Sequence, residues 1–163
     1  GIIEVFLESL IVLVIYLPPN LRRQPLVNYV AKMKHLHTAM QKTNVPHAIF
    51  VSSTSVYGNH PDDITEETTP TPATESGRQL LETEKLFLNA EKSENTIVRF
   101  GGLIGPKRHP VTMLSQKKGL KNGTAPVNLI HLEDCIAMLK TIISEFEKRG
   151  VSIPSYKARI LSK

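Results

Sequence analysis

The sequence predicts an α/β fold in which helices flank a parallel sheet, and three adjacent segments carry this prediction. Residues 10–17 are continuously apolar and rich in β-branched side chains, as in a strand that is covered on both faces. Residues 21–41 repeat apolar side chains every three or four positions, which is typical of an amphipathic helix. Residues 47–51 form a second apolar segment after a polar turn. Strand, helix and strand in this order indicate a right-handed βαβ unit with parallel strands.

The later segments continue this alternation. The helix predicted at 21–41 carries Pro25 in its first turn, where a missing N–H is tolerated. The remaining predicted elements are, in order, an acidic Pro-rich loop at 58–74, a helix at 76–91, a strand at 96–100, an irregular basic segment at 101–126, a strand at 127–130, a helix at 132–150 and a stretch without pattern at 151–163. The length of 163 residues, without internal repeats, predicts one domain.

Composition excludes several classes of site and partner. Cys135 is the sole cysteine, which rules out an intramolecular disulfide and a Cys-based zinc site and favours a reducing, cytoplasmic setting. His35 and His37 diverge on their helix, so no metal site is predicted. The apolar run at 10–17 is far shorter than the roughly 20 residues that cross a bilayer, and no membrane segment is expected. A net charge of +5 is mild, and nucleic acid is not expected as a partner.

Hydroxyl side chains gather at the end of the second predicted strand. Residues 51–58 read Val-Ser-Ser-Thr-Ser-Val-Tyr-Gly. In parallel sheets, ligands bind at the carboxyl ends of the strands, so these hydroxyls could hold a carbonyl or alcohol group. They could equally form a Ser/Thr-rich turn that satisfies its own backbone. Both explanations remain open at this point.

Four further segments follow this serine-rich motif in a recognisable order. They are the Pro-rich loop, Ser-Gly-Arg-Gln-Leu-Leu-Glu-Thr-Glu at 76–84, Val-Arg-Phe-Gly-Gly-Leu-Ile-Gly-Pro at 98–106, and Val-Asn-Leu-Ile-His-Leu-Glu-Asp at 127–134. Over roughly residues 9–140 the chain resembles the extended short-chain dehydrogenases/reductases, the NAD-dependent epimerase/dehydratase family. The resemblance implies a partial Rossmann-like, doubly wound sheet. It further implies an incomplete NAD(P)-binding domain with substrate-side elements at 1–150, an irregular tail at 151–163, and a truncated N-terminal portion.

The resemblance also implies where ligands bind. The implied cofactor is NAD or NADP, and its contacts fall on Leu17, Pro18, Pro19 and Ser52. The implied substrate contacts fall on Thr54, Gly101, Gly102, Asn128 and His131. Ser53 occupies the place of the family's Ser or Thr that hydrogen-bonds the reacting oxygen.

Two departures from the family pattern limit the implied chemistry. The family's general acid/base is a Tyr followed four residues later by a Lys that lowers the phenol pKa, whereas Ser76 and Leu80 occupy these positions. Tyr57 is either a substitute acid or a side chain that packs under the loop. No Gly-rich turn opens a helix, because the glycines from Gly101 onward lead into Pro106, so high NAD affinity is not expected from this chain alone.

The sequence therefore supports three functions. The first is an atypical NAD(P)-dependent oxidoreductase or epimerase with a small hydroxylated or nucleotide-linked substrate. The second is a binding or regulatory module without catalysis, and the third is a degenerate fragment. Family members commonly dimerise through the helices at 22–42 and 76–91, so a homodimer is an expected partner. The basic residues between 107 and 121 either form a solvated loop, which the absence of interleaved aromatic residues favours, or attract a phosphorylated substrate or nucleic acid.

Overall fold

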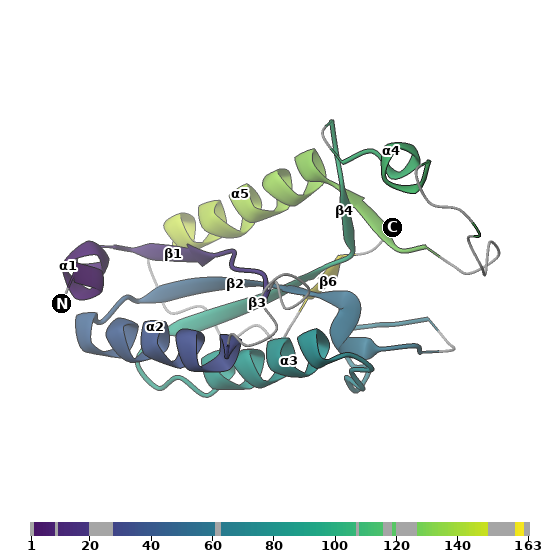
Figure 1. Cartoon of the computed structure of the whole chain (residues 1–163). Coiled ribbons are helices and arrows are strands. Elements are labelled where there is room, and N and C mark those ends of the chain that lie inside the picture. Colours follow the sequence, from purple (N-terminus) through teal and green to yellow (C-terminus); the bar gives the residue numbers. More distant parts are fainter. Residues whose placement is uncertain are drawn as a thin grey trace.

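The computed structural model describes residues 2–8, 10–19, 28–60, 63–106, 108–115, 119, 127–149 and 159–161. They form parallel sheets flanked by helices, which confirms the predicted α/β class (Figure 1). The elements are α1 (Ile2–Leu7), β1 (Val12–Ile15), α2 (Tyr29–Thr43), β2 (His47–Ser53), the 3₁₀ helix η1 (Thr54–Tyr57), α3 (Glu75–Leu88), β3 (Glu94–Phe100), β4 (Gly102–Ile104), α4 (Pro110–Leu114), β5 (Leu129–His131), α5 (Leu132–Arg149) and β6 (Arg159–Leu161).

The main sheet has four strands in the order β1-β2-β3-β6, and every pairing is parallel. Val12 lies opposite His47 at the start of the β1–β2 pair, which confirms that the first two predicted strands run in the same direction. β1 lies at an edge of this sheet, and among the described strands it pairs only with β2. β4 and β5 form a separate parallel pair.

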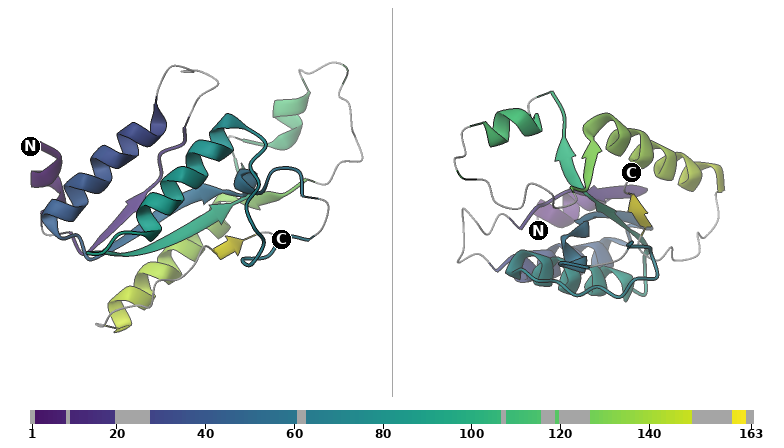
Figure 2. Two further views of the ribbon diagram at one scale, coloured as in Figure 1. Left: turned by 90° about the horizontal axis from the view of Figure 1, so that it is seen from below. Right: turned by 90° about the vertical axis from the view of Figure 1, so that its right-hand side faces the viewer.

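Helices cover both faces of the sheet. In Figure 1, α2 and α3 lie together below the sheet and α5 lies above it, and the views in Figure 2 agree. Side chains alternate between the two faces along β2. Ala48 and Phe50 therefore pack into the cluster between the sheet and the helices α2 and α3, whereas Ile49 and Val51 pack with Phe146 of α5.

Local capping explains where the two helices on the lower face begin. The Asn28 side chain accepts a hydrogen bond from the Ala31 N–H at the start of α2, and Thr74 does the same for the Gly77 N–H at the start of α3. α2 ends at Asn44, whose φ of 53° is left-handed. The predicted start of this helix at residue 21 is wrong, because Asn28 has an extended backbone and caps a helix that begins at Tyr29. Pro25, which the prediction placed in the first turn, lies outside the described residues.

Four short elements differ from the sequence-based expectation. α1 precedes the first strand, and only Leu7 of its six residues is buried, so it has no apolar periodicity to detect. β4 and α4 lie in the segment that was expected to be irregular. β6 lies within 151–163, where no pattern was found, and its definition comes from backbone pairing with β3. Pairing of this kind leaves little trace in a three-residue sequence.

Two kinds of feature are absent from the described part of the chain. No helix there is both long and apolar enough to cross a membrane. No group of three or more His, Cys, Asp or Glu side chains there could hold a metal ion.

Replacement of Gly58 by Ala is expected to destabilise the fold by about 2 kcal/mol or more. Its φ of 62° costs a residue with a Cβ roughly 1–2 kcal/mol, and that Cβ would lie 2.3 Å from the Thr71 carbonyl oxygen. Gly119→Ala is the matched control, because its φ is also positive, at 69°, but no described atom lies within 4 Å of the added carbon. Urea unfolding should show the larger loss at Gly58, and equal losses would contradict this explanation.

Candidate functional site

A cavity lies where the carboxyl ends of β1, β2 and β3 meet, the position at which open parallel sheets bind ligands. Its volume is about 300 Å³. The described residues that line it are Tyr16, Pro18, Pro19, Val51, Ser52, Ser53, Leu80, Phe100, Gly101, Leu103, Arg108, Leu132, Cys135, Ile136 and Leu139. The sheet therefore contributes its strand tips to this cavity, and α5 contributes a wall.

Ser53 is positioned to donate a hydrogen bond in this cavity. It follows Val51 at a spacing of two along β2, so its side chain emerges on the α5 face. Its Oγ accepts a hydrogen bond from the Ser55 N–H at 3.2 Å, which caps η1. Because a hydroxyl has one donor hydrogen besides its acceptor lone pairs, the Ser53 O–H can still donate to a ligand.

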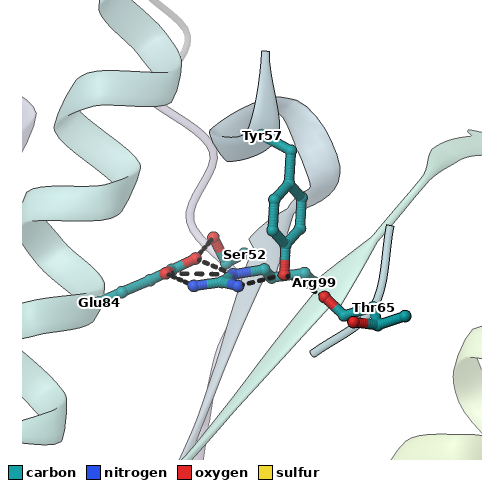
Figure 3. Close-up of polar contacts among 5 residues, drawn as sticks. All are labelled: Ser52, Tyr57, Thr65, Glu84 and Arg99. Carbon is teal, nitrogen blue, oxygen red and sulfur yellow. Dashed lines mark hydrogen bonds and ion pairs between the residues drawn. The ribbon is translucent and has the colours of Figure 1, made fainter. Parts of the chain in front are cut away.

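A buried polar network fixes the adjacent residue, Ser52. Ser52 and Arg99 are register partners on β2 and β3, so both side chains point toward α3. Glu84 of α3 accepts from the Ser52 hydroxyl at 2.5 Å and from Arg99 Nε and Nη2 at 3.0 and 2.5 Å (Figure 3). Burial acts to lower the pKa of Arg99, but hydrogen bonding and charge from Glu84 outweigh it and raise that pKa. Arg99 therefore keeps its charge, and its contacts with Glu84 join α3 to two strands.

Tyr57 belongs to this network and does not line the cavity. Its side chain is fully buried, its hydroxyl accepts from Arg99 Nη1, and the Arg99 guanidinium carbon lies 4.9 Å from its ring centre (Figure 3). The hydroxyl points to the Thr65 carbonyl oxygen, 3.4 Å away. Burial raises the pKa of Tyr57, and the Arg99 charge offsets this only in part. Such a phenol holds its proton and is positioned to support the loop.

The other predicted site residues divide into two groups. Pro18, Pro19, Ser52 and Gly101 line the cavity together with Ser53. Leu17, Thr54, Gly102, Asn128 and His131 are not among the lining residues. Asn20, which follows Pro19 in the sequence, lies outside the described residues.

Three of the predicted residues that do not line the cavity lie next to residues that do. The Leu17 carbonyl accepts a hydrogen bond at 2.7 Å from Tyr29, and burial raises the pKa of that phenol, so it remains a neutral donor. Asn128 packs so closely on Gly101 that an added Cβ would lie 2.6 Å from its Oδ1. His131 Nδ1 accepts from the Glu133 N–H at 3.3 Å, in the first turn of α5.

Leu80, which the resemblance predicts at the position of the family's lysine, gives this site an apolar wall. Ser76, Leu80 and Glu84 follow one another at spacings of four and so share one face of α3. Leu80 is 4% exposed and lines the cavity, whereas Ser76 does not. No Lys occurs among the described residues that line the cavity.

The sequence reasoning missed most of the α5 wall. Leu132, Cys135, Ile136 and Leu139 line the cavity, whereas the sequence predicted only the helix that carries them. Leu132 and Ile136 are in fact 41% and 44% exposed, and they face the cavity. Hydrophobic periodicity identifies a face of a helix but cannot distinguish a packed neighbour from a cavity. Glu84 and Arg99 were also missed, because each looks like an ordinary surface charge in the sequence.

The chain matches a known protein family and a curated relative. The NAD dependent epimerase/dehydratase family matches residues 24–153. "Protein YeeZ" of Escherichia coli strain K12 is 36% identical over 135 residues, which cover 80% of this chain and 48% of YeeZ. The chain thus spans about half the length of this curated relative.

Solved structures of epimerases and dehydratases are similar to this chain in fold. A candidate NAD-dependent epimerase/dehydratase from Methylobacillus flagellatus is 28% identical, with a TM-score of 0.67 over 94% of this chain and 53% of that protein. UDP-glucuronic acid 4-epimerase from Bacillus cereus, solved in complex with NAD, is 17% identical, with a TM-score of 0.73 over 98% of this chain and 56% of that one. The second similarity shows the fold alone.

Replacement of Glu84 by Ala is expected to cost about 3–5 kcal/mol, because it leaves the Arg99 guanidinium buried without its counter-charge. The control is Glu82→Ala on the same helix, which breaks only an exposed ion pair with Lys34 and should cost about 1 kcal/mol or less. Unfolding by urea measures both. If the Ala variant does not fold, Glu84→Gln provides the number, because it keeps the size of the side chain and one acceptor oxygen but removes the charge and the second acceptor. A cost no larger than that of Glu82→Ala would contradict the role of the pair.

The Cys135 thiol is expected to react slowly with iodoacetamide near pH 8. Burial raises its pKa, and the neighbouring Asp134 charge adds to this, so less of the reactive thiolate is present than in a free cysteine. The rate should keep rising with pH beyond the range in which a free thiol levels off. Asp134→Asn should shift this profile to lower pH, and an unshifted profile would show that access alone limits the reaction.

Proposed function

Because the chain belongs to the NAD-dependent epimerase/dehydratase family, we propose that it forms the nicotinamide-side and substrate-side walls of an NAD(P)-dependent enzyme. The substrate would be a small hydroxylated or nucleotide-linked compound, and the reaction an oxidoreduction or epimerisation. The observation that carries the proposal is the cavity at the strand tips, where Pro18, Pro19, Ser52 and Ser53 meet Gly101. The NAD bound in the Bacillus cereus relative supports the choice of cofactor.

The described residues fit one end of such a cofactor. A cavity of about 300 Å³ is at the small end of ligand pockets and suits a nicotinamide ring better than a whole dinucleotide. Pro18 and Pro19 would flank the ring with apolar surface, Leu17 would support them, and Ser52 would lie at its edge. The sequence has no Gly-rich turn at a helix N-terminus to hold a pyrophosphate, so binding by this chain would be weak. When bound, nicotinamide accepts or supplies a hydride.

On the substrate side, Ser53 would hydrogen-bond the reacting oxygen with the donor hydrogen that the η1 cap leaves free. Thr54, Gly101, Gly102, Asn128 and His131 would complete this side of the site, with Asn128 and Gly101 in direct contact. The apolar side chains of α5 would exclude water from the reacting atoms. The proposal includes self-association through α2 and α3, which lie side by side on one face of the sheet.

A second candidate function is a binding module without turnover. It is favoured by Leu80, because a buried leucine cannot lower the pKa of a neighbouring hydroxyl. Tyr57 does not supply the missing acid in this arrangement, since its hydroxyl is engaged by Arg99 away from the cavity. Ligand binding is common to both functions, and only proton transfer separates them.

Titration of NADH with the protein, followed by nicotinamide fluorescence, tests the shared step. We expect weak binding that Ser53→Asp reduces by about tenfold or more, because this change puts a charge into the cavity while Asp still caps η1. Ser55→Asp is the matched control, since Ser55 is exposed, does not line the cavity and should leave binding unchanged. No binding by the unsubstituted protein, or equal binding by all three proteins, would reject the proposal.

The double variant Ser76→Tyr/Leu80→Lys separates the enzyme from the module. It restores the residue types of the family's proton-transfer pair at a spacing of four on α3. Reduction of NAD+ with UDP-glucuronate, or oxidation of NADH with a simple ketone, by the unsubstituted protein would favour the enzyme. Turnover only by the double variant would favour the module.

A further inference from the structure

We infer that the substrate beside Ser53 has an apolar body and one anionic end, and is not a nucleotide-linked sugar. This inference rests on the proposed function and narrows its substrate class. It follows from three properties of the cavity: the chemistry of its α5 wall, the few polar side chains that remain available, and the position of Arg108.

The α5 wall would bury apolar surface and little else. Leu132, Ile136 and Leu139 succeed one another at spacings of three and four, so they form one continuous strip along the cavity. Leu103 and Phe100 extend the strip toward the sheet, and Leu80 closes it from the other side. Two of these side chains are more than 40% exposed, which leaves apolar area for a ligand to cover at roughly 25 cal/mol per Å².

Few polar side chains could replace the water around a sugar. The Ser52 hydroxyl donates to Glu84 and is already engaged. Among the described lining residues this leaves Ser53, the exposed Tyr16 and Arg108 as the strong polar side chains. A hexose ring against α5 would lose the hydration of several hydroxyls without gaining partners, at roughly 1–3 kcal/mol for each one. A hydrocarbon body carries no such cost.

Arg108 supplies the charge that selects an anionic end. It is exposed and lines the cavity, and among the described residues no carboxylate forms an ion pair with its guanidinium. Its backbone N–H donates to the Gly105 carbonyl at 2.9 Å, which fixes the turn that carries it. A guanidinium binds a carboxylate with two parallel hydrogen bonds. A ligand spanning the cavity could therefore place its oxygen at Ser53 and its carboxylate at Arg108.

The test uses 3-hydroxyoctanoate as probe and isothermal titration calorimetry as the measurement. We expect 3-hydroxyoctanoate to bind about tenfold or more tightly than 3-hydroxybutyrate, which lacks the apolar tail, and than UDP-glucuronate. Arg108→Gln should weaken the octanoate by about tenfold or more, whereas Arg78→Gln, an exposed arginine on α3 paired with Glu75, should not. Ile136→Asn should weaken the octanoate and leave the butyrate unchanged.

The methyl ester of the probe completes the design. It lacks the charge, so its affinity should be lower and should not respond to Arg108→Gln. Tighter binding of UDP-glucuronate, or equal effects of Arg108→Gln and Arg78→Gln, would overturn the inference. NADH fluorescence reports separately on the proposed function. NADH binding without selective octanoate binding would reject only the substrate class, and Arg108-dependent octanoate binding without NADH binding would reject only the cofactor proposal.

Discussion

The buried ion pair between Glu84 and Arg99 is the constraint on which the geometry of the site depends. It is the point at which α3, β2 and β3 are joined by charge as well as by apolar packing. A charge pair of this depth is stable only when its remaining hydrogen-bonding groups are satisfied, and here Ser52 and Tyr57 satisfy them. The same contacts orient the end of β2. Ser52 is held on the α3 face of the sheet, so the next residue, Ser53, points to the opposite face and reaches the cavity.

Two buried residues of α3 have different roles: one holds the helix to the sheet, and the other lines the cavity. Glu84 and Leu80 lie one turn apart on α3, and both face the sheet. Glu84 holds the helix to the sheet through Arg99, whereas Leu80 adds apolar surface to the cavity. A site of this kind can keep its shape while the reaction it supports changes or stops.

The sequence predicted the parts of the molecule that have strong periodicity. The buried strands β2 and β3 and the helices α2, α3 and α5 follow directly from apolar spacing, and parallel pairing follows from the connection between the strands. The cavity was predicted only at its strand tips, where the predicted residues Pro18, Pro19, Ser52, Ser53 and Gly101 line it. The roles of Glu84 and Arg99 could not be predicted, because burial of a charge depends on a partner that lies 15 positions away in the chain. β6 depends on backbone pairing, which composition does not record.

The position of β1 at the edge of the sheet has a consequence for handling the protein. Val14 is 39% exposed and Ile11 is 70% exposed, and the outer backbone groups of β1 pair with no described strand. An apolar edge of this kind is a template for sheet extension between molecules. Charged residues that would discourage such contacts are absent from Val12–Ile15. Association of molecules through this edge, more than unfolding, is therefore expected to limit the concentration at which the protein stays free of aggregates.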